Sequence, residues 1–331
     1  MPPIKRPAGV NNGMSERTVV VLREGAHGRP IEAYAEALRD RVTEWDVQLA
    51  RTPAEERELV ADAAVVTGPS MDAELLDAAG DLRLFACLYA GTSHLPLAAF
   101  AEREIPVTNA AGVHGPNVAE TVLGWLLTFA RGLHRGWQQG TNREWRHYQT
   151  RELQGSAVTV VGLGAIGRTV VDRLEPFGVE TVGVRHTPSK GGPTDEVYGF
   201  DEVHAACADA DYLVLACPLT DETRGLVDAE LFGTLPPDAV VVNVGRGPVV
   251  ETDALVTALQ KNDIRGAALD VTDPEPLPES HPLWTLSNAL VTPHNAGDTP
   301  AYYERVADIL ADNLERVADD ESGESLRNRA H

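Results

Sequence analysis

Three side chains with complementary chemistry stand in the second half of the chain, each just after a strand-like apolar run. Arg246 follows one run, Glu275 lies in a loop of prolines and acids after the next, and His294 follows a proline at the end of a third. A guanidinium can hold a carboxylate, an imidazole can protonate a nascent alkoxide, and a carboxylate can keep that imidazole charged. The trio predicts proton and hydride transfer to a 2-oxo acid. Taken singly, each also fits a structural role, as a loop base, a solvated turn and a packed histidine.

A glycine-rich turn precedes the trio and can hold the hydride carrier. It lies between an apolar run at 157–161 and a helical pattern at 166–174. In such a turn the first glycine permits the bend, the second admits a pyrophosphate, and the third lets helix and strand pack closely. The helix N-terminus then faces the phosphates. The predicted contacts are Gly162, Leu163, Gly164, Ala165, Ile166 and Gly167.

The end of the second strand of this half carries a base where an acid would bind the ribose 2′-hydroxyl of NAD. Arg185 stands 23 positions after Gly162. A guanidinium followed by hydroxyls and a lysine suits a 2′-phosphate. We therefore predict NADP as the preferred cofactor, with NAD accepted; the alternative is that Arg185 is an ordinary surface base. The further predicted contacts in this segment are His186, Thr187, Ser189 and Lys190.

The apolar pattern around these residues predicts α/β architecture with two parallel sheets, because short apolar runs alternate with helical patterns throughout. Expected strands cover 18–22, 63–67, 84–89, 107–109, 158–161, 181–185, 212–216, 239–244, 266–270 and 289–292. Expected helices cover 31–41, 54–61, 72–79, 97–104, 118–133, 166–174, 201–207, 252–261 and 302–317.

The helix at 118–133 is apolar on all sides, which indicates burial between domains or against a partner subunit. Asn117 and Glu120 have the spacing of a capping box, so we expect the helix to begin there.

Composition limits the class of protein. At 331 residues and 43% hydrophobic content, the chain suits two soluble domains and has no apolar run long enough for a membrane span. The opening, 1–16, is expected to be disordered and lacks the apolar stretch of a secretory signal, and the polar tail after Asp319 is expected to fray. Three cysteines without ligand spacing indicate buried thiols of a reducing cytoplasm, and no metal site is predicted.

The charge is strongly negative. Fifty acids stand against 28 bases, a net charge of −22, and only Lys5, Lys190 and Lys261 are lysines. Such a surface repels nucleic acid and anionic membranes. It fits either a well-solvated surface or, as a sharper hypothesis, adaptation of a halophilic protein to concentrated salt, where screening removes the repulsion among acids.

The motifs occur in an order that resembles the D-isomer-specific 2-hydroxyacid dehydrogenases, such as glyoxylate/hydroxypyruvate reductases and phosphoglycerate dehydrogenases. The resemblance runs from about Thr18 to Val317 and is strongest after Asn117. Its motifs lie at 162–167, 217–220, 242–247, 268–277 and 292–294.

The resemblance implies a Rossmann coenzyme domain inserted into a flavodoxin-like substrate domain, with both sheets doubly wound. Residues 1–113 and 298–331 would form the substrate domain, and residues 114–297 the coenzyme domain. It further implies an active cleft between the domains, a homodimer through the coenzyme domains, and reduction of small 2-oxo acids to D-2-hydroxy acids.

By the same matching, Arg246 would grip the substrate, His294 would be the acid/base and Glu275 its partner. Asp270 would orient the nicotinamide carboxamide, while backbone N–H groups in the first domain would bind the substrate carboxylate. Those backbone groups belong to Ala90, Gly91 and Thr92. The remaining implied cofactor contacts are Cys217, Pro218, Thr223, Val244 and Gly245.

Several alternatives stay open at this point. Cys217 fits a buried structural thiol, His114 fits the crossing between domains, and Trp145 fits either packing or a partner's cleft. Ser93-His94 departs from the pattern of many relatives, which leaves substrate preference open. Formate oxidation on the same fold would replace Glu275 by an amide, and a dinucleotide-sensing corepressor would bind proteins instead of turning over substrate.

Overall fold

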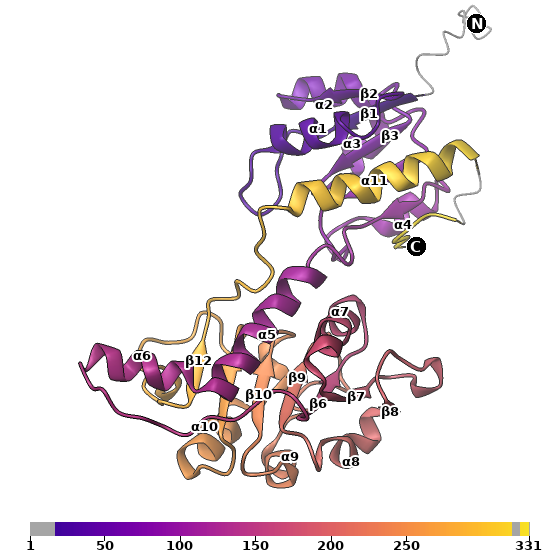
Figure 1. Cartoon of the computed structure of the whole chain (residues 1–331). Coiled ribbons are helices and arrows are strands. Elements are labelled where there is room, and N and C mark those ends of the chain that lie inside the picture. The colour runs from indigo at the N-terminus through magenta and orange to yellow at the C-terminus, as the bar shows by residue number, and fades with distance from the viewer. Residues whose placement is uncertain (1–16, 320–324, 331) are drawn as a thin grey trace, which may run out of the picture. The chain divides into compact units, whose positions relative to one another are not determined.

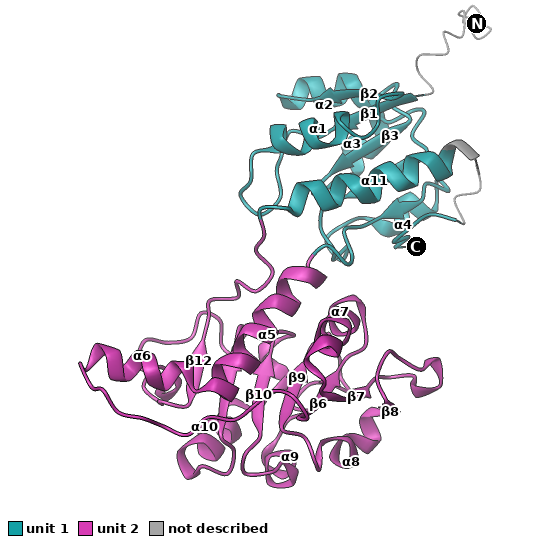
Figure 2. Cartoon of the chain, in the orientation of Figure 1, with its two compact units in different colours: residues 1–113, 300–331 teal, residues 114–299 magenta. Residues whose placement is uncertain are grey.

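The computed structural model of this chain describes residues 17–319 and 325–330. The predicted disorder of 1–16 lies outside these residues. The chain divides into two compact units, residues 1–113 with 300–331 and residues 114–299 (Figure 2). Each unit contains one sheet, and every strand pairing within it is parallel (Figure 1).

The first unit contains a five-stranded sheet in the order β2-β1-β3-β4-β5, which is the flavodoxin-like order. Its strands are β1 (Thr18–Val21), β2 (Asp46–Leu49), β3 (Val65–Gly68), β4 (Leu84–Cys87) and β5 (Val107–Thr108). Its helices are α1 (Ile31–Arg39), α2 (Pro53–Val60), α3 (Ala73–Ala78), α4 (Leu97–Ala101) and α11 (Tyr302–Asp319).

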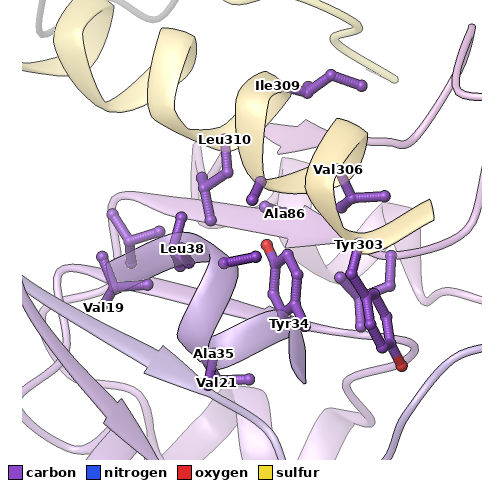
Figure 3. Close-up of a cluster of buried hydrophobic side chains, with 14 of the residues drawn as sticks. Val19, Val21, Tyr34, Ala35, Leu38, Ala86, Tyr303, Val306, Ile309 and Leu310 are labelled. Carbon is purple, nitrogen blue, oxygen red and sulfur yellow. The ribbon is translucent and has the colours of Figure 1, made fainter. Parts of the chain in front are cut away.

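Alternation along β1 explains why helices cover both faces of this sheet. Val19 and Val21 point into one buried cluster, and Val20 points into another on the opposite face. The first cluster is closed by α1 and by α11, as Figure 3 shows for Tyr34, Tyr303 and their neighbours. The last helix therefore completes the core of the unit in which the chain began.

Part of the tail after Asp319, which was expected to fray, is ordered. Residues 325–330 do not fray: Ala330 donates its N–H to Val107 at 2.7 Å, and Asn109 donates to Asn328 at 3.1 Å. Leu326 is 7% exposed. This segment covers the edge of β5, which would otherwise present unpaired backbone groups.

The second unit contains a seven-stranded sheet in the order β12-β11-β10-β9-β6-β7-β8, the Rossmann order with one added strand. Its strands are β6 (Ala157–Val161), β7 (Glu180–Val184), β8 (Glu196–Tyr198), β9 (Tyr212–Leu215), β10 (Val240–Asn243), β11 (Gly266–Leu269) and β12 (Ala289–Val291). Its helices are α5 (Gly115–Arg131), α6 (Leu133–Thr141), α7 (Ala165–Leu174), α8 (Val203–Cys207), α9 (Ala229–Thr234) and α10 (Thr252–Lys261). Short 3-10 turns are η2 (Glu175–Phe177), η3 (Pro188–Lys190), η4 (Phe200–Glu202), η5 (Gly247–Val249) and η6 (Pro282–Trp284).

Helix α5 begins earlier than predicted. Its N-cap is His114, and Asn117 lies inside the helix with its side chain donating to the carbonyls of Ala296 and Asp298. The capping-box prediction was therefore wrong, because Pro116 starts the helix one turn earlier and Asn117 bonds a distant loop instead.

Four elements were absent from the predicted pattern: β2, β8, α6 and α9. The edge strand β2 alternates polar and apolar residues, and α6 contains two glycines. Within residues 17–319 and 325–330, none of the helices combines the length and apolar character needed to cross a bilayer.

Candidate active site

The predicted functional residues of the second unit gather at one edge of its sheet. All strands of this sheet are parallel, so the loops that follow their carboxyl ends lie along the same edge. The strand order reverses between β6 and β9, where ligands bind in open α/β sheets. The residues after the strands are Gly162 for β6, Arg185 for β7, Cys217 for β9, Arg246 for β10, Asp270 for β11 and His294 for β12.

The glycine turn has the geometry that a pyrophosphate needs. Gly162 has a φ of +97°, and a Cβ there would lie 2.7 Å from the Cys217 backbone. A Cβ at Gly167 would lie 1.9 Å from the Gly162 carbonyl oxygen, so helix α7 and β6 pack at backbone contact. A Cβ at Gly164 would meet nothing within 4 Å. The middle glycine thus leaves open space in front of the helix.

The start of α7 offers hydrogen-bond donors to that space. Gly164 is its N-cap and provides no side chain, and the first bond back to the turn is donated by Arg168 to the Gly164 carbonyl. Among the described residues, the N–H groups of Ala165, Ile166 and Gly167 have no acceptor. These donors at the positive end of a ten-residue helix fit a dinucleotide pyrophosphate.

The segment after β7 carries the residues predicted to bind the 2′-phosphate of NADP. Arg185 is half-buried and donates to the Gly191 carbonyl at 2.5 Å, which closes the loop around η3. Ser189 and Lys190 are exposed on this loop, and Thr187 is half-buried. His186 Nδ1 lies 2.7 Å from the Glu222 carboxylate, a contact that the sequence did not predict.

Three of the predicted cofactor contacts near the glycine turn have buried side chains. Leu163 is 3% exposed beneath β7, and Thr223 is 1% exposed with its hydroxyl donating to the Pro218 carbonyl at 2.6 Å. Burial raises the pKa of the Cys217 thiol to about 11, so it stays protonated near neutral pH. These side chains determine the form of the turn and of the loop after β9, whereas Pro218 is exposed.

The loop after β10 presents an exposed guanidinium, that of Arg246. Asn243 is 1% exposed; its side chain accepts from the Gly245 N–H and donates to the Arg246 carbonyl. Arg246 is exposed, donates to the Gly245 carbonyl at 2.6 Å, and forms no ion pair with a residue in the described ranges. The sequence signal for this brace is an asparagine that ends an otherwise apolar strand, Val240–Asn243. Val244, the residue after β10, is buried, and its N–H donates to the Leu215 carbonyl at the end of β9.

The Arg246 loop and the Glu275 loop are in contact. A Cβ at Gly247 would lie 1.9 Å from the Thr272 carbonyl oxygen. No larger residue fits there, and the backbones after β10 and β11 are therefore held against each other. The two peptide bonds before Pro274 and Pro276, on either side of Glu275, are cis.

Glu275 and His294 form the predicted pair. Glu275 Oε2 lies 3.1 Å from His294 Nδ1, and Oε1 accepts the Thr272 N–H at 3.0 Å. Because a carboxylate only accepts, Nδ1 carries the proton in this pair, and Nε2 is left to face solvent or substrate. The imidazole side chain is 52% exposed, so a substrate can reach it.

The buried carboxylate of Asp270 organises the loop that holds His294. Asp270 is 3% exposed and accepts from the Thr292 hydroxyl at 2.7 Å and from the N–H groups of Asn295 and Ala296, both at 2.8 Å. The His294 N–H itself donates to the Asp270 carbonyl at 2.8 Å, and His294 has a φ of +52°. The role implied for Asp270 was a nicotinamide contact; the contacts present are to this loop.

The far end of the same loop is attached to α5. Asn117 donates to the Ala296 carbonyl at 2.9 Å, and His114 Nδ1 lies 2.8 Å from the Gly297 carbonyl. His114 thus lies beside the crossing, as its position in the chain suggested. Trp145 is 97% exposed in the segment after α6.

The predicted substrate donors of the first unit are also accessible. Ala90 and Gly91 are exposed after β4, and within the described residues the N–H groups of Ala90, Gly91 and Thr92 have no acceptor. The nearby His94 ring lies 2.8 Å from the Pro69 carbonyl.

Comparisons with known proteins agree with this geometry. A sequence model described as D-isomer specific 2-hydroxyacid dehydrogenase, NAD binding domain, matches residues 123–296. The chain is 33% identical over 313 residues to a glyoxylate reductase/hydroxypyruvate reductase of Homo sapiens, which covers 90% of this chain and 93% of that protein. It is 32% identical over 251 residues to a chloroplastic/mitochondrial formate dehydrogenase of Arabidopsis thaliana, covering 74% and 65%.

A solved structure extends the likeness to both units. It is a D-isomer specific 2-hydroxyacid dehydrogenase from Xanthobacter autotrophicus Py2 in complex with NADPH and MES, with a TM-score of 0.76, 27% identity, and coverage of 96% of this chain and 98% of that one. The family match covers more than half of the 331 residues and includes the glycine turn, Arg246 and the Glu275–His294 pair. The chain belongs to the D-isomer-specific 2-hydroxyacid dehydrogenase family.

Proposed function

We propose that this oxidoreductase reduces small 2-oxo acids to D-2-hydroxy acids, with His294 as the acid/base and NADPH as the preferred hydride donor. The observation that carries the proposal is the Glu275–His294 pair, whose exposed imidazole lies on the same sheet edge as an open glycine turn. A bound nicotinamide dinucleotide supplies the hydride that reaches the substrate carbonyl carbon.

The chain's own residues divide the remaining tasks. Arg246, without a carboxylate partner among the described residues, binds the substrate carboxylate and carbonyl oxygen through its forked N–H groups. His294 Nε2–H gives its proton to that oxygen as the C–H bond forms, which leaves a neutral imidazole and a hydroxyl group. Glu275 holds the ring and stabilises the imidazolium before transfer. In the first unit, the N–H groups of Ala90, Gly91 and Thr92 are available as donors to a carboxylate.

The preference for NADPH rests on the segment after β7. Arg185 uses one N–H for the Gly191 carbonyl, which leaves its other donors for a 2′-phosphate, and Thr187, Ser189 and Lys190 lie on the same loop. A carboxylate, that of Glu222, contacts this segment at His186 Nδ1, at 2.7 Å. The relative from Xanthobacter autotrophicus binds NADPH, which supports the same preference. NAD, which lacks the phosphate, would be accepted more weakly.

We further propose a homodimer through the second unit, in a reducing cytoplasm. Four large hydrophobic residues are exposed among those described, and three of them, Leu133, Trp137 and Trp145, lie on α6 and the segment after it. Such a concentration of apolar surface marks a protein interface. The three cysteines are free and buried, as in a reducing compartment.

Formate oxidation is the second candidate, favoured by the 32% identity to a formate dehydrogenase. Against it stands Glu275, since that activity would place an amide beside the histidine. A dinucleotide-sensing corepressor is the non-enzymatic candidate, and it would show cofactor binding without turnover.

A substrate panel tests these proposals. Purified protein is assayed with glyoxylate, hydroxypyruvate, pyruvate and branched 2-oxo acids against NADPH and NADH, and with formate against NADP and NAD. We expect NADPH oxidation with at least one small 2-oxo acid, and no reduction of NADP or NAD with formate. Cofactor binding without turnover on any 2-oxo acid would favour the corepressor, and formate oxidation would favour the second candidate. Chiral chromatography of the product gives its configuration.

A further inference from the structure

A recess of about 230 Å³ opens at the amino ends of β10 and β11, on the sheet edge opposite the glycine turn. Arg265 lines it from the position immediately before β11, where its backbone N–H donates to the Ala239 carbonyl at 2.9 Å. Arg135 and His134 enter from α6, and Arg151 enters from the segment before β6. Residues from three parts of the second unit therefore bring bases to one recess.

The recess has an excess of positive charge. Its one lining acid, Asp238, pairs with Arg151 at 2.7 Å. Arg135 and Arg265 form no ion pair with any residue in 17–319 or 325–330. In a chain with 50 acids and 28 bases, carboxylates are the commoner charge, so two unmatched guanidiniums in one recess need an explanation.

One guanidinium of the recess, that of Arg265, acts on two neighbouring rings, Tyr212 and His134. Burial raises the pKa of Tyr212, and the charge of Arg265, its hydrogen bond to Tyr212 and the charge of Arg151 oppose that rise, while Asp211 adds to it. Burial lowers the pKa of His134, and Arg135 and Arg265 lower it further. Arg265, whose Cζ lies 5.4 Å from the Tyr212 ring centre, is thus the base common to both groups.

Arg265 also carries an unmet hydrogen bond. Its Nε is the one buried side-chain nitrogen or oxygen among the described residues without a partner. A buried donor left unpaired is costly, and native structures rarely keep one without a ligand, ion or water to accept from it.

Helix ends do not set the charge of the recess. The negative end of α5 and the positive end of α6 meet at Gly132, which lines it, so their dipoles offset. The arginine side chains therefore decide which ligands the recess can hold.

We propose that this recess binds a small oxyanion, a phosphate or carboxylate group, through Arg135 and Arg265. The volume is below the roughly 300–1,000 Å³ of pockets for drug-sized ligands, so it suits a single anionic group and not a dinucleotide. Charge-assisted bonds from guanidiniums are the strongest that such a group can receive. A bound anion would join α6 and the segment at 149–151 to the start of the sheet, at a distance from the catalytic edge.

The proposal is tested by titrating inorganic phosphate into the full-length protein by calorimetry, at ionic strength held constant with chloride. Arg135→Gln and Arg265→Gln each remove one donor, and Arg143→Gln makes the same change on an exposed residue outside the recess. We expect saturable binding to the unmodified protein, a dissociation constant raised about tenfold or more in the two recess variants, and no change in Arg143→Gln. Should Arg265→Gln fail to fold, the exposed Arg135 carries the comparison alone.

A parallel titration with succinate distinguishes the source of the anion. Tighter binding of phosphate points to a phosphorylated ligand, and tighter binding of succinate points to a carboxylate; both support the site. Equal phosphate binding by all four proteins would mean that the anion lies elsewhere, at the glycine turn for example, and would overturn the proposal. The absence of saturable binding by either anion would also overturn the proposal. Altered dimerisation of Arg135→Gln in sedimentation would then indicate that a carboxylate of a second copy occupies the recess.

Discussion

The two ends of the functional edge in the second unit are built in different ways. At the β11–β12 end, the 3%-exposed carboxylate of Asp270 fixes the His294 loop through one hydroxyl and two backbone N–H groups. At the β7 end, His186 and Glu222 form a pair with side chains 72% and 55% exposed. Buried, hydrogen-bonded groups fix geometry, whereas exposed pairs contribute little to stability. The difference suggests that chemistry depends on the first end and cofactor choice on the second.

Removing the imidazole should have the largest effect. We expect His294→Ala to lower kcat for 2-oxo acid reduction by roughly 10²–10⁴-fold, the usual worth of general acid–base catalysis. Cofactor binding, followed by quenching of protein fluorescence, should stay within about threefold, because the glycine turn is untouched. His147→Ala, on an exposed residue, is the matched control. Normal turnover by His294→Ala would end the assignment of His294 as the acid.

Removing one charge from the Asp270 network should disturb the same end indirectly. In Asp270→Asn an amide N–H would face backbone N–H donors, so at least one of the three bonds is lost, at a cost of about 1–3 kcal/mol. A displaced His294 should lower kcat by roughly 10–100-fold. Hydrogen exchange at Asn295 and Ala296 should become faster, and Asp263→Asn on the surface should change neither quantity. A catalytic loss with unchanged exchange would assign Asp270 another role.

Reaction direction should set the sign of the pH dependence. Reduction needs the imidazolium of His294 and should fall about tenfold per pH unit once that form is in the minority, while oxidation of the 2-hydroxy acid needs the neutral ring and should gain rate. Steady-state profiles in both directions measure this. Parallel profiles for the two directions would contradict a shared acid/base.

The contrast between the two ends also marks how far sequence can lead. The alternation of apolar runs and helical patterns predicted ten of the strands. Because these strands are parallel, Arg246, Glu275 and His294 are expected after the carboxyl ends of neighbouring strands. Edge strand β2 was missed because Asp46 and Gln48 interrupt its apolar run. The role of Asp270 in the 292–296 loop could not be predicted, because loop hydrogen bonds depend on turns that leave no periodic pattern. In the sequence, Asn117 fits a helix cap, and only its hydrogen bond to the distant Ala296 carbonyl shows that it has another role.

At the β7 end, changing the sign of one side chain should alter preference without harming chemistry. We expect Arg185→Asp to shift the ratio of kcat/KM for NADPH over NADH by about tenfold or more toward NADH, since a carboxylate repels the 2′-phosphate and can accept from a 2′-hydroxyl. The kcat with the better cofactor should stay within about threefold. The exposed Arg143→Asp is the control for net charge. An unchanged ratio would refute Arg185 as the selecting residue and would leave Lys190 to be tested in the same way.

Salt should have the smallest effect and should act differently on the two ends. At about 1 M salt the screening length is about 3 Å, so repulsion among the 50 acids is largely removed. The melting temperature should therefore rise between dilute buffer and molar KCl, by roughly 2–4 °C for each kcal/mol gained. The exposed His186–Glu222 pair is open to the same screening, whereas the buried Asp270 network is not, so Asp270→Asn should lower the melting temperature by a similar amount at both salt concentrations. A melting temperature that does not rise would remove the argument for salt adaptation and leave the acids as a solvated surface.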